Sequence, residues 1–293
     1  MTYRASTISR QRRSKLEIEQ LDAQIIDVLR EDHPQSVRHV FYRMTNPRLR
    51  EPVEKTDRGY RHVQERCVRL RRSGAVPYSW IADLSRRGYF TNTFRDAGDF
   101  LRRVHGLYRA DLWRDADRRC EVWCESRSIA SVLIADCNEL AVDLFPCGGF
   151  ASLSFVHEAA EQQNSFGDRR PLTVCYVGDF DPAGVLIDVA LERELRQHLV
   201  GEIALLFIRI GINDDQIATY DLPTKPRKAS DQRSLHVAET VEAEAMPARI
   251  LRDLVRAEVE RLLPEGALRA AKVAEASERE QLTRIAATLG GAP

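Results

Sequence analysis

The chain has 293 residues, with 44 acidic and 44 basic side chains and 43% hydrophobic residues. That size accommodates one large domain or two of ordinary size, and the composition is that of a chain with a packed core. No run approaches the roughly 20 apolar residues that a membrane helix needs, and no apolar segment follows the basic amino terminus. We therefore expect a cytoplasmic protein without a membrane partner.

The cysteines and histidines give no sign of a zinc or disulfide scaffold. The six cysteines have no CxxC spacing, and the seven histidines show no ligand spacing. The sequence predicts buried free thiols.

The charge is distributed unevenly along the chain. Residues 1–119 contain 26 Lys and Arg against 16 Asp and Glu, whereas residues 120–293 contain 18 against 28. This asymmetry favours a basic module that binds a polyanion, joined to a second module with a different task. A solvated, arginine-rich surface is the alternative interpretation.

The first 90 residues have the pattern of a winged helix-turn-helix domain. Apolar spacing predicts helices over 15–31, 37–45 and 58–72, and the segment 74–87 reads as a strand or wing. The third helix is strongly basic, as in a helix that lies against DNA. Its arginines are Arg58, Arg61, Arg66, Arg69, Arg71 and Arg72.

A helical linker is expected over 91–119, and the pattern then changes to an α/β domain over 120–293. Short apolar runs alternate with helical stretches, which predicts a Rossmann-like parallel sheet covered by helices. A helical tail follows from about residue 247. The predicted strands are 120–125, 141–145, 172–179 and 203–210.

Acidic residues follow two of these strands. Glu125 closes the first, and Asp179 and Asp181 close the third in the string GDFDPAG. Ligands of parallel sheets bind at the carboxyl ends of the strands, and carboxylates alone suit a hard cation such as Mg²⁺, with Mn²⁺ as the alternative. For Asp181, a helix cap before Pro182 explains the residue equally well.

These motifs resemble those of a known family. VWCESRSIASVL followed by a strand and GDFDPAGVLID is similar to the Toprim domain of topoisomerases, primases and related nucleases, particularly that of the topoisomerase VI A subunit and the meiotic double-strand-break enzyme. The resemblance implies that Glu125, Asp179 and Asp181 hold Mg²⁺. FPCGGFASLSF is a weaker match to a glycine-containing loop, and Ser126 and Arg127 depart from the usual glycine or lysine.

The same family places a catalytic tyrosine in a winged helix ahead of Toprim, and Arg38-His39-Val40-Phe41-Tyr42 matches its tyrosine string. Helical periodicity puts Tyr42 roughly 150° from the apolar stripe of its helix, one turn after Arg38. On that polar face Tyr42 would either attack phosphate or only contact DNA. In that family the tyrosine of one subunit works at the metal of the other, which implies a homodimer.

Two further groups of charged residues have less specific patterns. Lys225, Arg227 and Lys228 would contact phosphate or belong to a solvated loop. Glu242 and Glu244 would approach the metal, although a charged helix start is the preferred interpretation.

The resulting expectation is Mg²⁺-dependent cleavage of double-stranded DNA by a nucleoid-associated protein. Either Tyr42 transesterifies the phosphodiester, or water activated by the metal hydrolyses it, as in Toprim nucleases of defence or mobile-element systems. No ATP-binding GxxxxGK[ST] string is present, so strand passage would require a separate ATPase subunit. A non-catalytic DNA-binding regulator is the second alternative.

Overall fold

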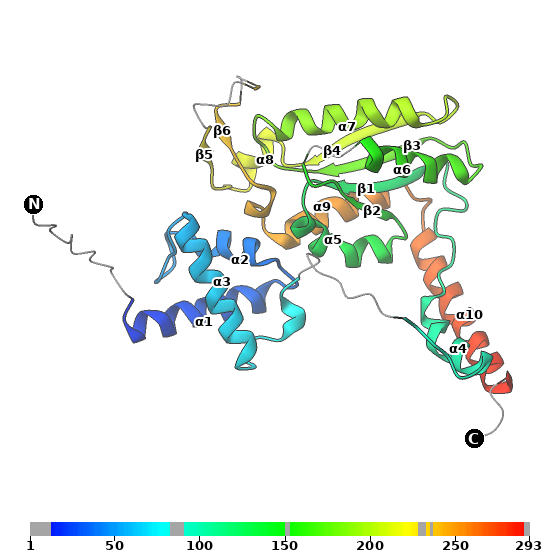
Figure 1. Ribbon diagram of the computed structural model, residues 1–293, viewed down its shortest axis with the longest axis horizontal. Coiled ribbons are helices and arrows are strands. Elements are labelled where there is room, and N and C mark those ends of the chain that lie inside the picture. Colours follow the sequence, from blue (N-terminus) through cyan, green and yellow to red (C-terminus); the bar gives the residue numbers. More distant parts are fainter. Residues whose placement is uncertain (1–12, 83–90, 150–152, 228–232, 235–236, 290–293) are drawn as a thin grey trace, which may run out of the picture. The chain divides into compact units, whose positions relative to one another are not determined.

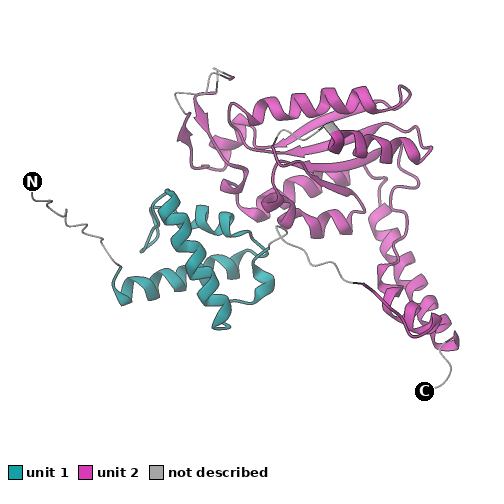
Figure 2. Ribbon diagram, viewed as in Figure 1, with its two compact units in different colours: residues 1–82 teal, residues 83–293 magenta. Residues whose placement is uncertain are grey.

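The computed structural model describes residues 13–82, 91–149, 153–227, 233–234 and 237–289. The chain divides into two compact units, Met1–Ala82 and Asp83–Pro293, coloured separately in Figure 2. No helix in the described ranges is long and apolar enough to cross a membrane.

The first unit is built from three helices, as the sequence predicts. They are α1 (Lys15–Glu31), α2 (Val37–Met44) and α3 (Asp57–Arg72). Each begins at a hydroxyl side chain that accepts a backbone N–H of the first turn, a Ser or Thr cap that is readable from sequence. The caps are Ser14, Ser36 and Thr56.

The predicted wing is not confirmed. The segment after α3 forms a short 3₁₀ turn, η1 (Tyr78–Trp80), and Ile81 then makes a single parallel bridge with Gln35. The remainder of the predicted wing lies largely within 83–90, outside the described residues.

The second unit contains a four-stranded sheet in which all strands are parallel (Figure 1). The strand order is β2-β1-β3-β4. This confirms the predicted α/β class and strand rhythm, although each strand differs by a few residues from its apolar run. The strands are β1 (Arg119–Cys124), β2 (Asp143–Pro146), β3 (Leu172–Val177) and β4 (Leu205–Gly211).

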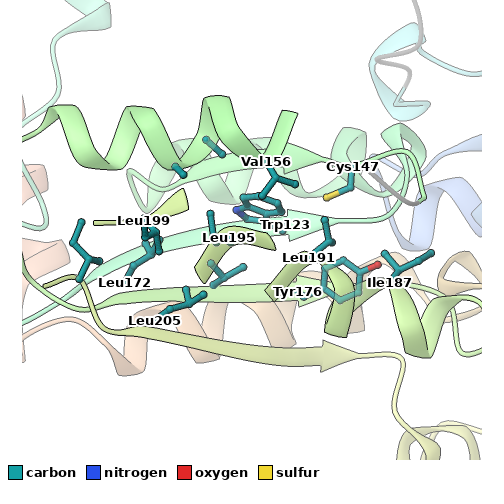
Figure 3. Packing of buried hydrophobic residues seen from close by; sticks show 14 residues of the cluster. Trp123, Cys147, Val156, Leu172, Tyr176, Ile187, Leu191, Leu195, Leu199 and Leu205 are labelled. Carbon is teal, nitrogen blue, oxygen red and sulfur yellow. The ribbon is translucent and has the colours of Figure 1, made fainter. Parts of the chain in front are cut away.

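Helices cover both faces of this sheet. On one face, α6 (Leu153–Ser165) and α7 (Gly184–His198) pack over Trp123, Val174 and Tyr176 (Figure 3). On the other face lie α5 (Arg127–Glu139) and α9 (Ala248–Arg261), while α8 (Asp214–Thr219) follows β4 (Figure 1). Burial on both faces explains why the strand sequences are continuous apolar runs.

Two smaller features complete the unit. The expected linker 91–119 contains α4 (Ala97–Val104) and η2 (His105–Leu107), which pack against α10 (Ala267–Leu289), so this segment belongs to the second unit. A two-stranded antiparallel ladder joins β5 (Lys225–Pro226) to β6 (Glu239–Thr240) and leads into η3 (Ala243–Ala245).

The cysteine prediction is confirmed. All six cysteines are buried and free. The closest thiol contact is between Cys120 and Cys175 on neighbouring strands, at 3.9 Å between sulfur atoms.

Candidate metal centre

Glu125 and Asp179 lie side by side at the carboxyl edge of the sheet. Their strands are neighbours, and Cys124 of β1 is in register with Val177 of β3. One residue beyond β1, the Glu125 carboxylate accepts a hydrogen bond from the Asp179 backbone N–H through Oε2 at 2.9 Å. The prediction that these two residues meet at one edge is therefore confirmed.

Asp181 faces the start of α7. Its Oδ1 atom accepts backbone N–H groups from Ala183 at 2.9 Å and Gly184 at 2.6 Å, so the helix-cap interpretation is correct for this residue. Its Oδ2 atom accepts no hydrogen bond from the described residues, and the same holds for Oε1 of Glu125 and Oδ2 of Asp179. Within the described part of the chain, each of the three carboxylates thus has one oxygen to which no donor is bonded.

A fourth acid joins the cluster from a distant part of the chain. The segment after β6 pairs with the loop after β3 through the bridge between Phe180 and Val241, and Ala243 N–H donates to Asp179 Oδ1 at 2.8 Å. Glu244 is only 5% exposed and accepts a hydrogen bond from Ser126 Oγ at 3.3 Å.

Glu242 directly precedes the 3₁₀ helix η3 and Glu244 lies in its first turn, as a charged helix start predicts, and tertiary pairing also buries the Glu244 side chain. Its neighbour Glu242 accepts from Lys225 Nζ at 3.2 Å. Ser126, where the sequence departs from the family pattern, also caps α5.

The electrostatics of the cluster are unfavourable for several negative charges. Burial, together with the negative charges of Glu125 and Glu244, raises the pKa of Asp179 to about 8. Burial also raises the pKa of Glu125, an effect to which Asp181 and Glu244 contribute and which Arg209 opposes. A bound cation would favour the ionised carboxylates and relieve this repulsion.

Arg209 of β4 is a cationic residue that binds the loop between β3 and α7. The guanidinium has five N–H groups, and together they donate five hydrogen bonds. They go to the backbone oxygens of Gly178 (3.2 Å), Asp179 (2.5 Å), Gly184 (3.3 Å) and Ile212 (3.0 Å), and to Asp188 Oδ2 (2.8 Å). Nothing in the sequence pattern singles out this arginine.

Two glycines of the string GDFDPAG are required by close packing. A Cβ atom on Gly184 would lie 2.1 Å from the carbonyl oxygen of Asp179. A Cβ atom on Gly178 would lie 2.5 Å from the hydroxyl of Tyr176, a fully buried group that has no hydrogen-bond partner among the described residues. Figure 3 shows Tyr176 within the core that α7 covers.

The candidate ligands have the chemistry that a hard cation requires, but they do not surround a single point in the structure. Every candidate ligand is a carboxylate oxygen, the ligand type of Mg²⁺ and Mn²⁺. Among the described residues, however, no three Asp, Glu, His or Cys side chains stand together as a formed metal site. The fit rests on the donor chemistry, the uncommitted oxygens and the accumulated negative charge.

Tyr42 lies in the first unit, and its predicted setting on a polar face is wrong. Its side chain is only 6% exposed and packs beside Phe41. The chain after α2 folds back, with Val53 N–H donating to the carbonyl oxygen of Met44 at 2.8 Å and the Lys55 ammonium 5.4 Å from the centre of the Tyr42 ring. A helical wheel considers one helix alone, so it cannot show that a later segment of the chain covers Tyr42.

Arg38 is exposed, and its guanidinium lies 5.4 Å from the centre of the Tyr60 ring. The structure therefore places Arg38 against an aromatic ring that the sequence interpretation did not include.

The basic residues of α3 have different surroundings. Arg66 is held by Asp22 of α1, with 2.7 Å between Nε and Oδ1. Arg71 is half-buried over the ring of Tyr78. The exposed arginines share the helix face opposite the buried Val63, Cys67 and Leu70: Arg58, Arg61, Arg69 and Arg72.

The basic residues near β5 lie in the segment that leads toward the acidic cluster. Lys225 pairs with Glu242, while the Nη1 atom of Arg227 is buried and has no hydrogen-bond partner among the described residues. Lys228 lies outside the described residues.

Comparisons with protein-family models, with curated proteins and with solved structures find no match for this chain.

Proposed function

We propose that this chain cleaves double-stranded DNA in a reaction that depends on Mg²⁺ or Mn²⁺. The observation that carries the proposal is the group of four carboxylates at the carboxyl edge of the parallel sheet, Glu125, Asp179, Asp181 and Glu244. The pKa values of Glu125 and Asp179 are raised, and acids with raised pKa values are typical of functional sites rather than of packing. The resemblance to the Toprim motifs supports the same assignment.

Glu125, Asp179 and Asp181 would hold the cation. A divalent ion there supplies positive charge that stabilises phosphoryl oxygens and lowers the pKa of water. The chain itself orients these carboxylates: Asp179 N–H positions Glu125, Ala243 N–H positions Asp179, and the start of α7 positions Asp181.

The DNA would be gripped at the phosphate backbone by two basic surfaces. One is the exposed arginine face of α3, and the other is the segment with Lys225 and Arg227, which leads into the acidic cluster. Lys228 is a further phosphate contact expected from the sequence alone. Arg227 is a cation with a buried, unsatisfied N–H, and a phosphate oxygen is a suitable acceptor for it.

Hydrolysis by water is the mechanism that we favour over attack by Tyr42. A phenol must lose a proton whose ordinary pKa is near 10 and must reach the phosphate, and the Tyr42 side chain is almost fully covered. Pairing of two copies, a separate ATPase subunit and a nucleoid-associated location are further predictions from the resemblance.

The proposal is tested by incubating supercoiled plasmid with the full chain and Mg²⁺ or Mn²⁺. We expect the wild-type chain to nick or linearise the plasmid, and EDTA or Asp179→Ala to reduce cutting to background. Asp253→Ala removes an exposed acid of α9 and should cut normally. Tyr42→Phe should cut as the wild type does and leave no protein attached to the DNA ends.

Other outcomes would identify the alternatives. Loss of cutting in Tyr42→Phe, together with protein covalently bound to DNA ends in the wild type, would establish transesterification. DNA binding without cutting under every metal condition, and unchanged in Asp179→Ala, would instead favour the non-catalytic regulator.

A further inference from the structure

Arg209 connects both ends of the loop that carries the two aspartates. Its Nη2 atom donates to the carbonyl oxygens of Gly178 and Asp179, where β3 ends, and its Nη1 atom donates to the carbonyl oxygen of Gly184, where α7 begins. The side chain is only 14% exposed. Both ends of the four-residue stretch between these anchor points are therefore hydrogen-bonded to the same planar guanidinium group.

The guanidinium is itself held on several sides. Asp188 of α7 accepts a charge-assisted hydrogen bond at 2.8 Å, Ile212 accepts one from Nε, and the ring of Tyr176 lies with its centre 5.5 Å away. An arginine held in this way keeps one orientation, because its planar fork is anchored at both edges.

We infer that Arg209 is a positioning residue for the proposed cation site, which sets the backbone of the loop so that Asp179 and Asp181 present their uncommitted oxygens to the ion. This inference rests on the proposed function. Arg209 does not touch the ion or the substrate; it acts through three backbone carbonyl oxygens of the loop. Its positive charge also offsets part of the negative charge of the cluster.

Lysine cannot replace this arginine. A lysine has one ammonium nitrogen, which cannot reach carbonyl oxygens spread around a guanidinium plane. Arg209→Lys keeps the positive charge but loses the hydrogen bonds to the loop, so this variant separates the effect of the charge from the effect of the hydrogen-bond geometry. Guanidinium ion added to Arg209→Ala would restore the geometry without a covalent link.

The test measures binding of Mn²⁺ to the full chain through the electron paramagnetic resonance signal of the free ion. We compare the wild type with Arg209→Ala, Arg209→Lys and Arg196→Ala; Arg196 is a half-exposed arginine of α7 whose guanidinium pairs with Glu192 on the same helix. Circular dichroism and thermal melting without metal establish that each variant is folded.

We expect Arg209→Ala to weaken Mn²⁺ binding by about 10–100-fold, the range found for residues that orient metal ligands. The Mn²⁺ affinity of Arg209→Lys should be closer to that of Arg209→Ala than to that of the wild type, and Arg196→Ala should bind Mn²⁺ as the wild type does. Millimolar guanidinium chloride should restore part of the affinity of Arg209→Ala, whereas an equal concentration of sodium chloride should not.

Wild-type affinity in folded Arg209→Ala or in Arg209→Lys would overturn the role of Arg209 while leaving the cation site intact. Absence of Mn²⁺ binding by the wild-type chain would overturn the cation site itself and this inference with it. If Arg209→Ala does not fold, the comparison of Arg209→Lys with the wild type decides the question.

Discussion

Glu121 lies within β1 and Glu125 one residue beyond its end, four residues later, yet they have different settings. Glu121 is 1% exposed and faces α6, where its carboxylate accepts hydrogen bonds from Trp123 Nε1 at 2.6 Å and from Gln163. Burial raises the pKa of Glu121 to about 7, against the lowering effect of both donors. We assign this residue to the core and not to the candidate site, since it lies within the strand and not at its end.

The raised pKa of Glu121 predicts a pH-dependent contribution to stability. The folded state binds the Glu121 proton more tightly than the unfolded state. The stabilisation of the fold that results is therefore complete below the unfolded pKa of 4.5 and is lost as pH rises through about 7. Glu121→Gln mimics the protonated acid. Its gain in unfolding free energy over the wild type should grow by about 3 kcal/mol between acidic and mildly alkaline pH.

Urea unfolding at pH 5 and pH 8 measures this gain. Glu265→Gln, at an exposed position, should show no such growth. A gain for Glu121→Gln that is equal at both pH values would contradict the raised pKa.

Single residues also show where sequence reasoning succeeds. Glu125, Asp179 and Asp181 were identifiable because each follows a strand whose end is marked by the apolar pattern. The burial of Tyr42 and of Glu244 was not predicted, because it depends on segments that return from elsewhere in the chain. Arg209 was missed because its role comes from carbonyl oxygens, which carry no sequence signal.

Among the elements, the turn between β3 and α7 is tightly constrained by close backbone packing. Gly184 is needed because the start of α7 approaches the carbonyl oxygen of Asp179 too closely for any side chain. This steric reason explains the glycine in GDFDPAG independently of the metal. The cap by Asp181 then fastens the helix start to the same loop.

We therefore expect Gly184→Ala to destabilise the chain by about 1–3 kcal/mol, as overpacked sites do, because either the loop or the helix must shift. Thermal melting measures the change. Gly201→Ala is the matched control, since a Cβ atom there meets nothing within 4 Å. Equal melting temperatures for the two variants would show that the turn accommodates the extra methyl group.

At the same scale, periodicity predicted the three helices of the first unit and the four parallel strands of the second, because local spacing and burial on both sheet faces determine them. It did not predict the short strands β5 and β6 or the packing of α4 on α10. Those contacts join segments that are weakly patterned and far apart in sequence.

For the whole molecule, the zero net charge conceals a basic first part and an acidic second part. The exposed arginines of α3 give the basic excess a defined surface. If this surface meets DNA phosphates, each contact releases counterions, and the affinity then falls with salt in proportion to the number of contacts.

Arg61→Ala and Arg69→Ala should each weaken DNA binding and reduce the slope of log affinity against log salt by about 1. The affinity of the full chain for a labelled duplex at several salt concentrations provides the measurement. Arg284→Ala, an exposed arginine of α10 paired with Glu280, should leave the slope unchanged. Equal slopes for all three variants would exclude the α3 face as the phosphate contact.

The bridge between Phe180 and Val241, with the hydrogen bond from Ala243 to Asp179, has a consequence during synthesis of the chain. Domains begin to fold as they leave the ribosome, amino-terminal parts first. Glu125, Asp179 and Asp181 emerge early, but the segment that orients Asp179 and brings Glu244 emerges about 60 residues after the two aspartates. The acidic cluster therefore forms late, so a nascent or prematurely terminated chain lacks the assembled site.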